Sequence, residues 1–470
     1  MKKVLLHAVL IAIALGLAAT TPATAQITLL AVGSLTQSRV GPYADLSGLH
    51  NTLQNGDPAN ILGGLGSGFA YASGHTFLAL PDRGPNAVSY DSLIDDTVTY
   101  IPRFHTITMR LKPNPDAGLP FILTPKLRAT TLLSSFTPLV YGTGDGLGVG
   151  SGVPPQNNFF LHYFTGRSDA IDPNQNSGNS RDGRLDSEGI RLSNDGRSVF
   201  ISDEYGPYVY QFDRVTGVRI RAYKLPDHLF VSNLRPVGND EIADNTSGRT
   251  ANKGMEGLAI TPDGLTLVGI MQNALIQDAA EGGPAKNLLR IVTIDVISGR
   301  THEYAYLLTT GSGVSEIVAI NQHEFLVDER DGKGRGDGSK AKIKQLFKID
   351  LANAVDVTAM DGTTAATHAV SKTLFLDIVA VLTAAPYNWD PKQIPAKLEG
   401  LAFGPDVFNG STKLHTLWVA NDNDFLKDVD DGSGNGTTFA NPNQFFVFGF
   451  TDADLAGSKL VPQQFHRFRW

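Results

Sequence analysis

Short apolar runs alternate with polar, turn-forming runs along most of the chain. The clearest example is GIRLSNDGRSVFISDEYGPYVYQFDRVTG, which begins at Gly189. Its segments at 190–192, 198–202 and 208–212, rich in Ile, Val, Phe and Tyr, predict three strands, because such segments bounded by Gly, Asn and Asp are typical of strands. The Asn-Asp-Gly at 194–196 predicts a hairpin turn, since these residues tolerate the positive φ that tight hairpins require.

The same unit returns four more times. The other copies are GSGFAYASGHTFLALPDRGPNA with FHTITMRL, GLAITPDGLTLVGIMQNALIQD with LLRIVTIDVISG, SEIVAINQHEFLVDERDG with KIKQLFKIDL, and GLAFGPDVFNGSTKLHTLWVANDNDF with QFFVFGF. A repeat of three or four strands over about 40 residues indicates a β-propeller, an all-β fold. A pair of β-sandwiches is the alternative, but sandwiches do not require regular copies.

The two ends of the chain predict how the propeller closes. The N-terminal segment QITLLAVGSL and the C-terminal tail QQFHRFRW could form one more sheet between them, which makes six blades in one domain over residues 26–470. Pairing N- and C-terminal strands in one blade closes the ring and leaves no exposed edge.

Residues 1–25 have the parts of a secretory signal peptide. Lys2 and Lys3 give a basic start, residues 4–19 are almost entirely apolar, and Ala-Thr-Ala at 23–25 is a cleavage site. A membrane anchor is the alternative, but the small residues at the end favour cleavage. We therefore expect an exported protein, periplasmic or extracellular, with no membrane attachment after cleavage.

Charge and composition restrict the classes of molecule that the protein is expected to bind. Without the two signal lysines, the 39 basic residues become 37 against 47 acidic ones, a net charge of −10. This charge disfavours nucleic acid as a partner and suits cation binding. The chain has no cysteine, so neither disulfides nor thiol chemistry is available. We expect a monomer that acts on a small anionic or ester substrate.

A glutamate precedes the first strand in four copies of the repeat. These residues are Glu188, Glu256, Glu316 and Glu399; three are followed by glycine, whereas Glu316 is followed by Ile317. First strands line the central channel of a propeller, so we expect the four carboxylates to surround one mouth as metal ligands. Glu-Gly as turn chemistry, with the carboxylate capping backbone amides, explains any single pair equally well.

A second set of polar residues follows the second strand of each copy. It reads Asp82-Arg83, Asp203-Glu204, Gln272-Asn273, Asp328-Glu329-Arg330 and Asn421-Asp422-Asn423-Asp424. We expect Asp203, Glu204 or Asp82 to act in catalysis, as a metal ligand or general base. Arg83, Arg330 and Lys253 are the expected substrate-binding residues, because they flank the acidic positions and suit an anionic group.

The residue types indicate calcium as the cofactor. Carboxylate and amide oxygens in loose geometry are the ligands that Ca²⁺ prefers. Zinc is disfavoured, because there is no cysteine and the eleven histidines show no paired spacing. The chain also lacks a G-x-S-x-G elbow, a P-loop and an H-E-x-x-H motif.

LPDRGPNA, DSEGIRLSNDGRSVFISDEYGPYVYQFD, NKGMEGLAITPDG, KLEGLAFGPD and LWVANDNDF together resemble the phytase-like family, described as having esterase-like activity of phytase. The resemblance covers residues 63–450 and implies a secreted bacterial β-propeller that hydrolyses phosphate or other esters. Six-bladed calcium-dependent propeller phytases would be the mechanistic model, in which channel carboxylates hold calcium that binds phosphate and activates water.

Three functional hypotheses follow. The first is a calcium-dependent esterase or phosphatase. The second is a lactonase-like propeller with one channel calcium, in which Asn273, Asn421 or Asn423 add amide ligands and the basic residues are not needed. The third is a binding or scaffold propeller with structural calcium. The position of Arg83 and Arg330 separates them, because anionic ester chemistry requires both beside the carboxylates.

Overall fold

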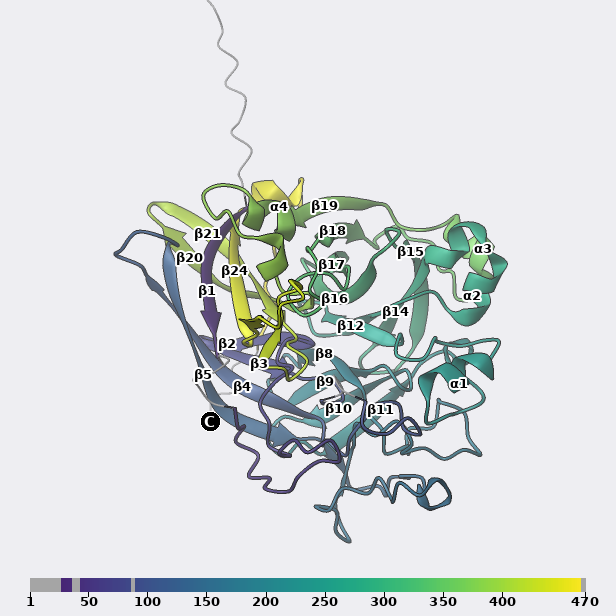
Figure 1. The fold of residues 1–470 in the computed structure, drawn as a ribbon. Coiled ribbons are helices and arrows are strands. Elements are labelled where there is room, and N and C mark those ends of the chain that lie inside the picture. The colour runs from purple at the N-terminus through teal and green to yellow at the C-terminus, as the bar shows by residue number, and fades with distance from the viewer. Residues whose placement is uncertain (1–26, 36–42, 86–88, 466–470) are drawn as a thin grey trace, which may run out of the picture.

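The strands form a ring of four-stranded antiparallel sheets around a central channel (Figure 1). The structure is a computed structural model that describes residues 27–35, 43–85 and 89–465, so the predicted signal peptide lies outside the described residues. The fold is all-β with few helices, and it is a β-propeller.

Five blades are present in the described part of the chain. The first contains β2 (Gly68–Ser73), β3 (Thr76–Leu80), β4 (Arg103–Pro113) and β5 (Phe121–Leu132). The second contains β8 (Ser187–Leu192), β9 (Ser198–Asp203), β10 (Tyr208–Asp213) and β11 (Arg219–Lys224). The third contains β12 (Met255–Ile260), β13 (Thr266–Met271), β14 (Leu288–Asp295) and β15 (Thr301–Leu307). The fourth contains β16 (Gly313–Ala319), β17 (Glu324–Arg330), β18 (Lys344–Asp350) and β19 (Lys372–Asp377).

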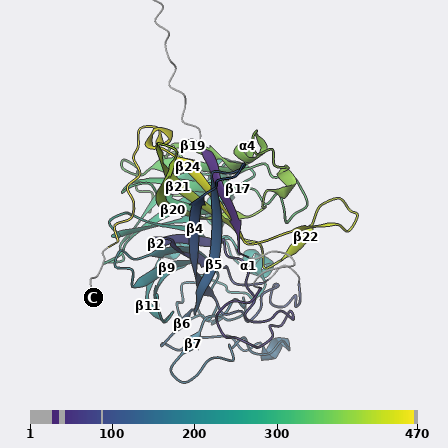
Figure 2. The ribbon, with the colours of Figure 1, turned by 90° about the vertical axis from the view of Figure 1, so that its left-hand side faces the viewer.

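The fifth blade closes the ring by combining the first strand of the chain with its last three long strands. It contains β20 (Leu398–Asn409), β21 (Thr412–Asn421), β24 (Gln444–Phe450) and, as its outer strand, the N-terminal β1 (Thr28–Ser34). The expected closure by N- and C-terminal strands is therefore confirmed, since β1 pairs with β24. Figure 2 shows β1 beside the long strands β4 and β5 of the first blade.

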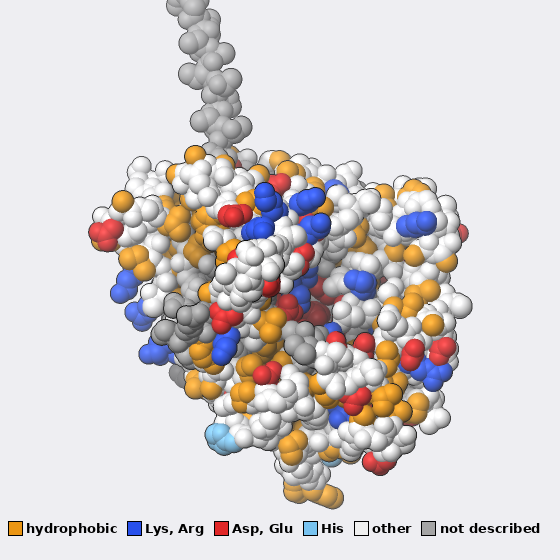
Figure 3. All heavy atoms as spheres, viewed as in Figure 1, with side chains coloured by type: hydrophobic (Ala, Val, Ile, Leu, Met, Phe, Trp, Pro, Cys, Tyr) orange, Lys and Arg blue, Asp and Glu red, His pale blue; other side chains and the backbone are white. Residues whose placement is uncertain are grey.

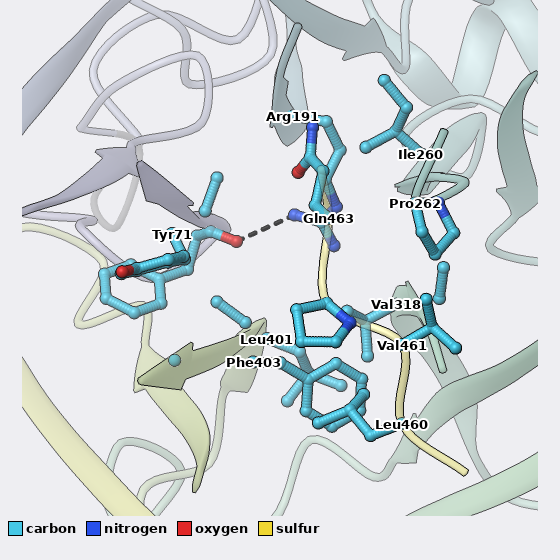
Figure 4. Close-up of a pocket in the computed structure, with 16 residues that line it drawn as sticks. Tyr71, Arg191, Ile260, Pro262, Val318, Leu401, Phe403, Leu460, Val461 and Gln463 are labelled. Atoms are coloured by element: carbon cyan, nitrogen blue, oxygen red, sulfur yellow. Dashed lines mark hydrogen bonds between the residues drawn. The ribbon is translucent and has the colours of Figure 1, made fainter. Parts of the chain in front are cut away.

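The prediction of six blades is wrong for the described residues. The N-terminal strand completes the blade that already holds β24, and residues 463–465, the described part of the predicted C-terminal strand, form no strand. The tail, taken here from residue 460, instead crosses the channel at the end formed by the last residues of the inner strands. There the amides of Val461 and Gln464 donate to the carbonyls of Ile320 and Pro262. Gln463 Nε2 donates to the Leu192 carbonyl at 2.6 Å. Figure 4 shows Leu460, Val461 and Gln463 of the tail among inner-strand residues.

The remaining elements are short. Two-stranded ribbons join β6 (Ser134–Ser135) with β7 (His162–Tyr163) and β22 (Asp428–Asp430) with β23 (Thr438–Ala440). The α-helices are α1 (Gly238–Ala243), α2 (Ile276–Glu281), α3 (Gly362–Ala366) and α4 (Ile378–Thr383). The 3₁₀ helices are η1 (Asp145–Leu147), η2 (Asp227–Leu229), η3 (Gly283–Asn287), η4 (Pro391–Gln393) and η5 (Asp452–Leu455). Within the described residues, no helix has the length and apolar character needed to cross a membrane.

The core lies between the blades. Each pair of neighbouring blades encloses its own apolar cluster, for example Leu80 with Ile190 and Ile201 between the first two. Inner strands are therefore buried on both faces, and every residue of β8 and β12 is buried. This explains why Leu258, Ala259 and Ile260 at the end of β12 are consecutive apolar residues and do not alternate with polar ones. The inner strands contact one another around the ring, so their first residues meet at one channel mouth.

Candidate metal centre at the channel mouth

The strand register places one residue of each blade in a first ring at the mouth. In β12 and β20 the pairing with the next strand skips Glu256 and Glu399, which therefore bulge toward the channel. Glu188 lies in the corresponding bulge of β8. In β16 the skipped residue is Ser315, and Ser67 precedes Gly68 in the first blade as the glutamates precede their glycines. The first ring is thus Ser67, Glu188, Glu256, Ser315 and Glu399.

Glu316 does not belong to this ring. The register gives it the place that glycine has in the other blades, opposite Asp328. It lies deeper in the channel, fully buried, where Oε1 accepts the amides of Leu258 and Ile317 at 2.9 Å. Its Oε2 lies 3.0 Å from Arg191 Nη2 in an ion pair. The departure from the Glu-Gly pattern at Ile317 was the sequence signal of this shift.

A second ring follows the second strands. Read by the same register, its members are Asp82, Glu204, Gln272, Arg330 and Asp422. All five line a cavity of about 440 Å³, together with four members of the first ring and with Lys253 and Lys397. Figure 3 shows the hollow near the centre of this face, with acidic and basic side chains inside it.

Asp203 precedes the second ring by one residue and does not line the cavity. Successive strand side chains point to opposite faces, so Asp203 faces away from Glu204. Its Oδ1 accepts the backbone amides of Asp186 and Tyr205, each at 3.1 Å. Asp203 thereby fixes the turn that carries the neighbouring acids.

Four carboxylates gather on one side of the mouth. Carboxylate oxygens of Asp186, Glu188 and Glu204 lie within 4.8 Å of one another, and Glu256 is the charged neighbour that most raises the pKa values of both glutamates. The sequence reading missed Asp186. Its position two residues before Glu188 was the available signal, since alternate strand residues share a face.

The electrostatics of this four-carboxylate cluster favour a cation. Burial, followed by neighbouring carboxylates, raises the pKa values of Glu188 and Glu204 well above the usual range and that of Glu256 to about 8. Glu256 is 3% exposed, and its Oε2 has no hydrogen-bond partner among the described residues. Buried like charges with an unpartnered oxygen are stabilised when a cation binds between them.

The donor set fits calcium. Two oxygens bound to one calcium ion at about 2.4 Å lie at most about 4.8 Å apart, which is the spacing of the three oxygens here. The three carboxylates supply three to six of the six to eight oxygens that calcium takes. Asp186, Glu188 and Glu204 are the residues that would hold it, with Glu256 as the neighbouring charge.

The opposite side of the mouth carries its own cations. Lys397 Nζ lies 2.8 Å from Asp422 Oδ2 and also pairs with Asp424. Arg330 donates to Ser315 Oγ at 2.7 Å and pairs with Glu399. Lysine and arginine therefore neutralise this side of the mouth, whereas on the other side four carboxylates face Arg83 and Lys253.

The other predicted basic residues also reach the cavity. Arg83 Nη1 lies 2.5 Å from Asp186 Oδ2 and contacts Asn252. Lys253 Nζ donates to Gln272 Oε1 at 3.2 Å. Arg83 and Arg330 both lie beside the carboxylates and not on the outer surface.

The amide residues of the lactonase-like hypothesis are used differently. Asn273 lines the cavity. Asn421 Oδ1 accepts the amide of Gln444 at 2.6 Å, and Asn423 Oδ1 accepts the amide of Gly64 at 2.8 Å. Two of the three amide side chains therefore accept hydrogen bonds from backbone amides.

Comparison with known proteins agrees with the motifs. A family model described as "Phytase-like: Esterase-like activity of phytase" matches residues 60–425. A secreted, uncharacterised protein of Arthroderma benhamiae is 32% identical over 292 residues, and the match spans about half of each chain, 54% in both cases.

Solved propellers resemble the chain only distantly. The periplasmic gluconolactonase PpgL of Pseudomonas aeruginosa has 12% identity and a TM-score of 0.33, covering 90% of this chain and 99% of its own. The PQQ-bound aldose sugar dehydrogenase of Streptomyces coelicolor has 11% identity and a TM-score of 0.30, covering 89% and 97%. The family model spans most of the chain and includes every residue of the two rings at the mouth. The protein therefore belongs to the phytase-like family.

Proposed function

We propose that the protein is an exported, calcium-dependent ester hydrolase that acts on phosphate esters at the channel mouth. The observation that carries the proposal is the four-carboxylate cluster: oxygens of Asp186, Glu188 and Glu204 lie within 4.8 Å of one another, and a buried oxygen of the neighbouring Glu256 has no partner among the described residues. Membership of the phytase-like family supports hydrolysis. The signal-like residues 1–25 and the secreted relative support export.

Calcium bound to this cluster would supply a Lewis acid for the substrate oxygens and for a water molecule. The chain's own cations would bind the anionic group from the other side of the cavity. Arg330 is suited to this role, because Ser315 and Glu399 fix its guanidinium before a substrate arrives. Lys253 and Lys397 line the same cavity.

Asp82 is the candidate general base. It lines the cavity outside the four-carboxylate cluster, and its Oδ1 accepts the amide of Gly84 at 2.9 Å. Burial, followed by the charge of Asp422, raises its pKa well above the usual range. A carboxylate with a raised pKa accepts a proton from an attacking water more readily near neutral pH.

The placement of Arg83 and Arg330 favours phosphate esters over lactones. Both arginines lie in the mouth, as anionic ester chemistry requires, whereas only Asn273 of the three amides reaches the cavity. A lactonase-like reaction and a non-catalytic propeller with structural calcium are the alternatives that an experiment must separate.

The test is hydrolysis of 4-nitrophenyl phosphate and 4-nitrophenyl acetate, each with calcium and with excess chelator. We expect phosphate release that chelator abolishes and calcium restores. Cleavage of the acetate alone would contradict phosphate specificity. Inactivity on both, with a calcium-dependent rise in melting temperature, would overturn the hydrolase and leave calcium in a structural role.

A further inference from the structure

We propose that a side pocket next to the channel mouth binds a neutral, ring-bearing group of the substrate, so that the preferred substrates are aryl esters. The side pocket is a cavity of about 610 Å³ between residues 43–62 and the loop at 423–428. The inference rests on the proposed function for the reaction, but binding to the pocket can be measured without any turnover.

The side pocket adjoins the mouth through one ion pair. Lys397 lines the mouth cavity, and its Nζ pairs with Asp424, which lines the side pocket. The chain also passes from one cavity to the other at Asp422, since the next residues line the side pocket. A substrate whose ester lies at Lys397 and Asp82 can therefore extend into the side pocket.

The lining of the side pocket suits an apolar ring. Tyr43, Tyr90 and Phe425 contribute aromatic side chains, and Ile61, Leu62 and Leu426 contribute aliphatic ones. Pockets of this size with a mostly apolar lining bind small organic groups, and aromatic rings stack on aromatic side chains.

The charges of the pocket exclude an anion. Its lining contains Asp57, Asp424 and Asp428 against Lys427, a net charge of −2. A phosphate or carboxylate is therefore repelled here and attracted to the basic side of the mouth. This division orients the substrate, with the ester in the mouth and the neutral ring in the side pocket.

The loop at 423–428, which lines the side pocket, has a strained backbone. Asp424 and Phe425 are consecutive non-glycine residues with positive φ, 49° and 58°. Gly63 makes room for them, since a Cβ there would lie 2.6 Å from Phe425 Cα. Such conformations persist only where the surrounding structure fixes them, and they cluster at ligand sites.

The direct test is binding of 2-naphthol, a neutral aromatic alcohol, measured by calorimetry on the full-length folded protein. Ile61→Trp fills the side pocket from its wall, and Tyr43→Ala removes one aromatic face. Tyr304→Ala is the matched control, because this partly buried tyrosine lies on β15 and lines neither cavity. We expect saturable binding by the wild type and by the control, and at least about tenfold weaker binding by Ile61→Trp.

Absence of saturable binding, or equal binding by Ile61→Trp, would overturn the side pocket. If the Ile61→Trp variant does not fold, Tyr43→Ala with the same expected loss replaces it. The second measurement compares kcat/KM for 2-naphthyl phosphate and ethyl phosphate. We expect the ratio of the two values to fall at least about tenfold in the filled variant, because the difference in leaving-group reactivity is the same for both proteins, and an unchanged ratio would contradict the pocket. Binding of 2-naphthol without any ester hydrolysis would overturn the proposed reaction and leave the side pocket standing.

Discussion

At the scale of single residues, Glu256 and Glu316 look equivalent in the sequence but have different surroundings. Glu256 lines the mouth cavity with an oxygen that has no partner among the described residues, whereas Glu316 is fully buried and paired with Arg191. Glu256 forms no ion pair among those found for the described residues, whereas Glu316 forms one with Arg191. The same substitution should therefore have opposite consequences at the two positions.

We predict that at pH 9, above the Glu256 pKa of about 8, Glu256→Gln removes one of four clustered negative charges. In calcium-free buffer at this pH the variant should melt at a temperature equal to or above that of the wild type, because like-charge repulsion falls. Its calcium affinity should fall at least about tenfold, since a negative charge beside the ion is lost. Calorimetric titration and thermal unfolding check both effects, and an unchanged calcium affinity would contradict the assigned cluster.

Glu316→Gln is the matched comparison. We predict a loss of about 3 kcal/mol in the free energy of unfolding, because the buried Arg191 guanidinium loses its carboxylate. Calcium affinity should stay within twofold of the wild-type value. Urea unfolding and calorimetric titration measure the two quantities, and a tenfold loss of calcium affinity would return Glu316 to the ligand set.

His105 predicts a pH dependence of stability that is independent of the mouth. It is fully buried in β4, and burial lowers its pKa from 6.5 to about 4. Between these values the unfolded chain binds a proton that the folded protein does not, so stability falls as pH drops below about 6.5. The loss should reach about 2 kcal/mol between pH 7 and pH 5.

In His105→Gln this component of the pH dependence should vanish. Urea unfolding of both proteins at pH 7 and pH 5 gives the comparison. Identical changes with pH in the two proteins would show that His105 does not titrate differently in the folded state.

At the scale of elements, the inner strands approach one another so closely that their glycines have no room for a side chain. A Cβ on Gly257 of β12 would lie 2.9 Å from the Cα of Glu316 in the neighbouring inner strand. Gly189 and Gly400 meet neighbouring strands at similar distances. The glycine of the Glu-Gly pair therefore serves inter-blade packing.

We predict that Gly257→Ala costs about 1–3 kcal/mol, because the neighbouring backbone must move. Gly146→Ala is the control, since a Cβ there has no atom within 4 Å. Urea unfolding measures both, and a Gly257→Ala variant as stable as the control would refute the packing role.

The repeated pattern was enough to predict the blades and much of the mouth, but register decided the rest. Strand segments such as 190–192 and 208–212 lie within β8 and β10, and the turn at 194–196 has the expected positive φ at Gly196. Which residue of a strand bulges toward the channel depends on pairing with the next strand. That pairing separates Ser315 from Glu316 and Glu204 from Asp203, and one sequence does not reveal it.

At the scale of the whole molecule, ring closure depends on one N-terminal strand. Leu29 and Leu30 of β1 are fully buried, and β1 covers the edge of β24, whose sequence is QFFVFGF. The five copies gave the correct number of blades, and the sixth was predicted from the two chain ends, because the pattern does not show whether an end strand starts a sheet or completes one.

We predict that a chain without residues 1–34 loses at least about 4 kcal/mol of stability, the contribution of two buried leucines and of the strand pairing. It should also self-associate through the exposed β24 edge. A chain that begins at Ile27 is the control. Urea unfolding and light scattering give the readouts, and a stable monomer without β1 would contradict closure by this strand.

The tail that crosses the channel at the end opposite the mouth has a kinetic consequence. Leu460, Val461 and Gln463 lie among residues from the inner strands, and beside them Arg191 of β8 donates to the carbonyls of Phe69 on β2 and Ile317 on β16. A molecule that enters the mouth must therefore leave by the same opening. Under the proposed phosphate-ester hydrolysis, product and incoming substrate would use one passage, so inorganic phosphate should inhibit competitively and its departure should limit turnover at high substrate concentration.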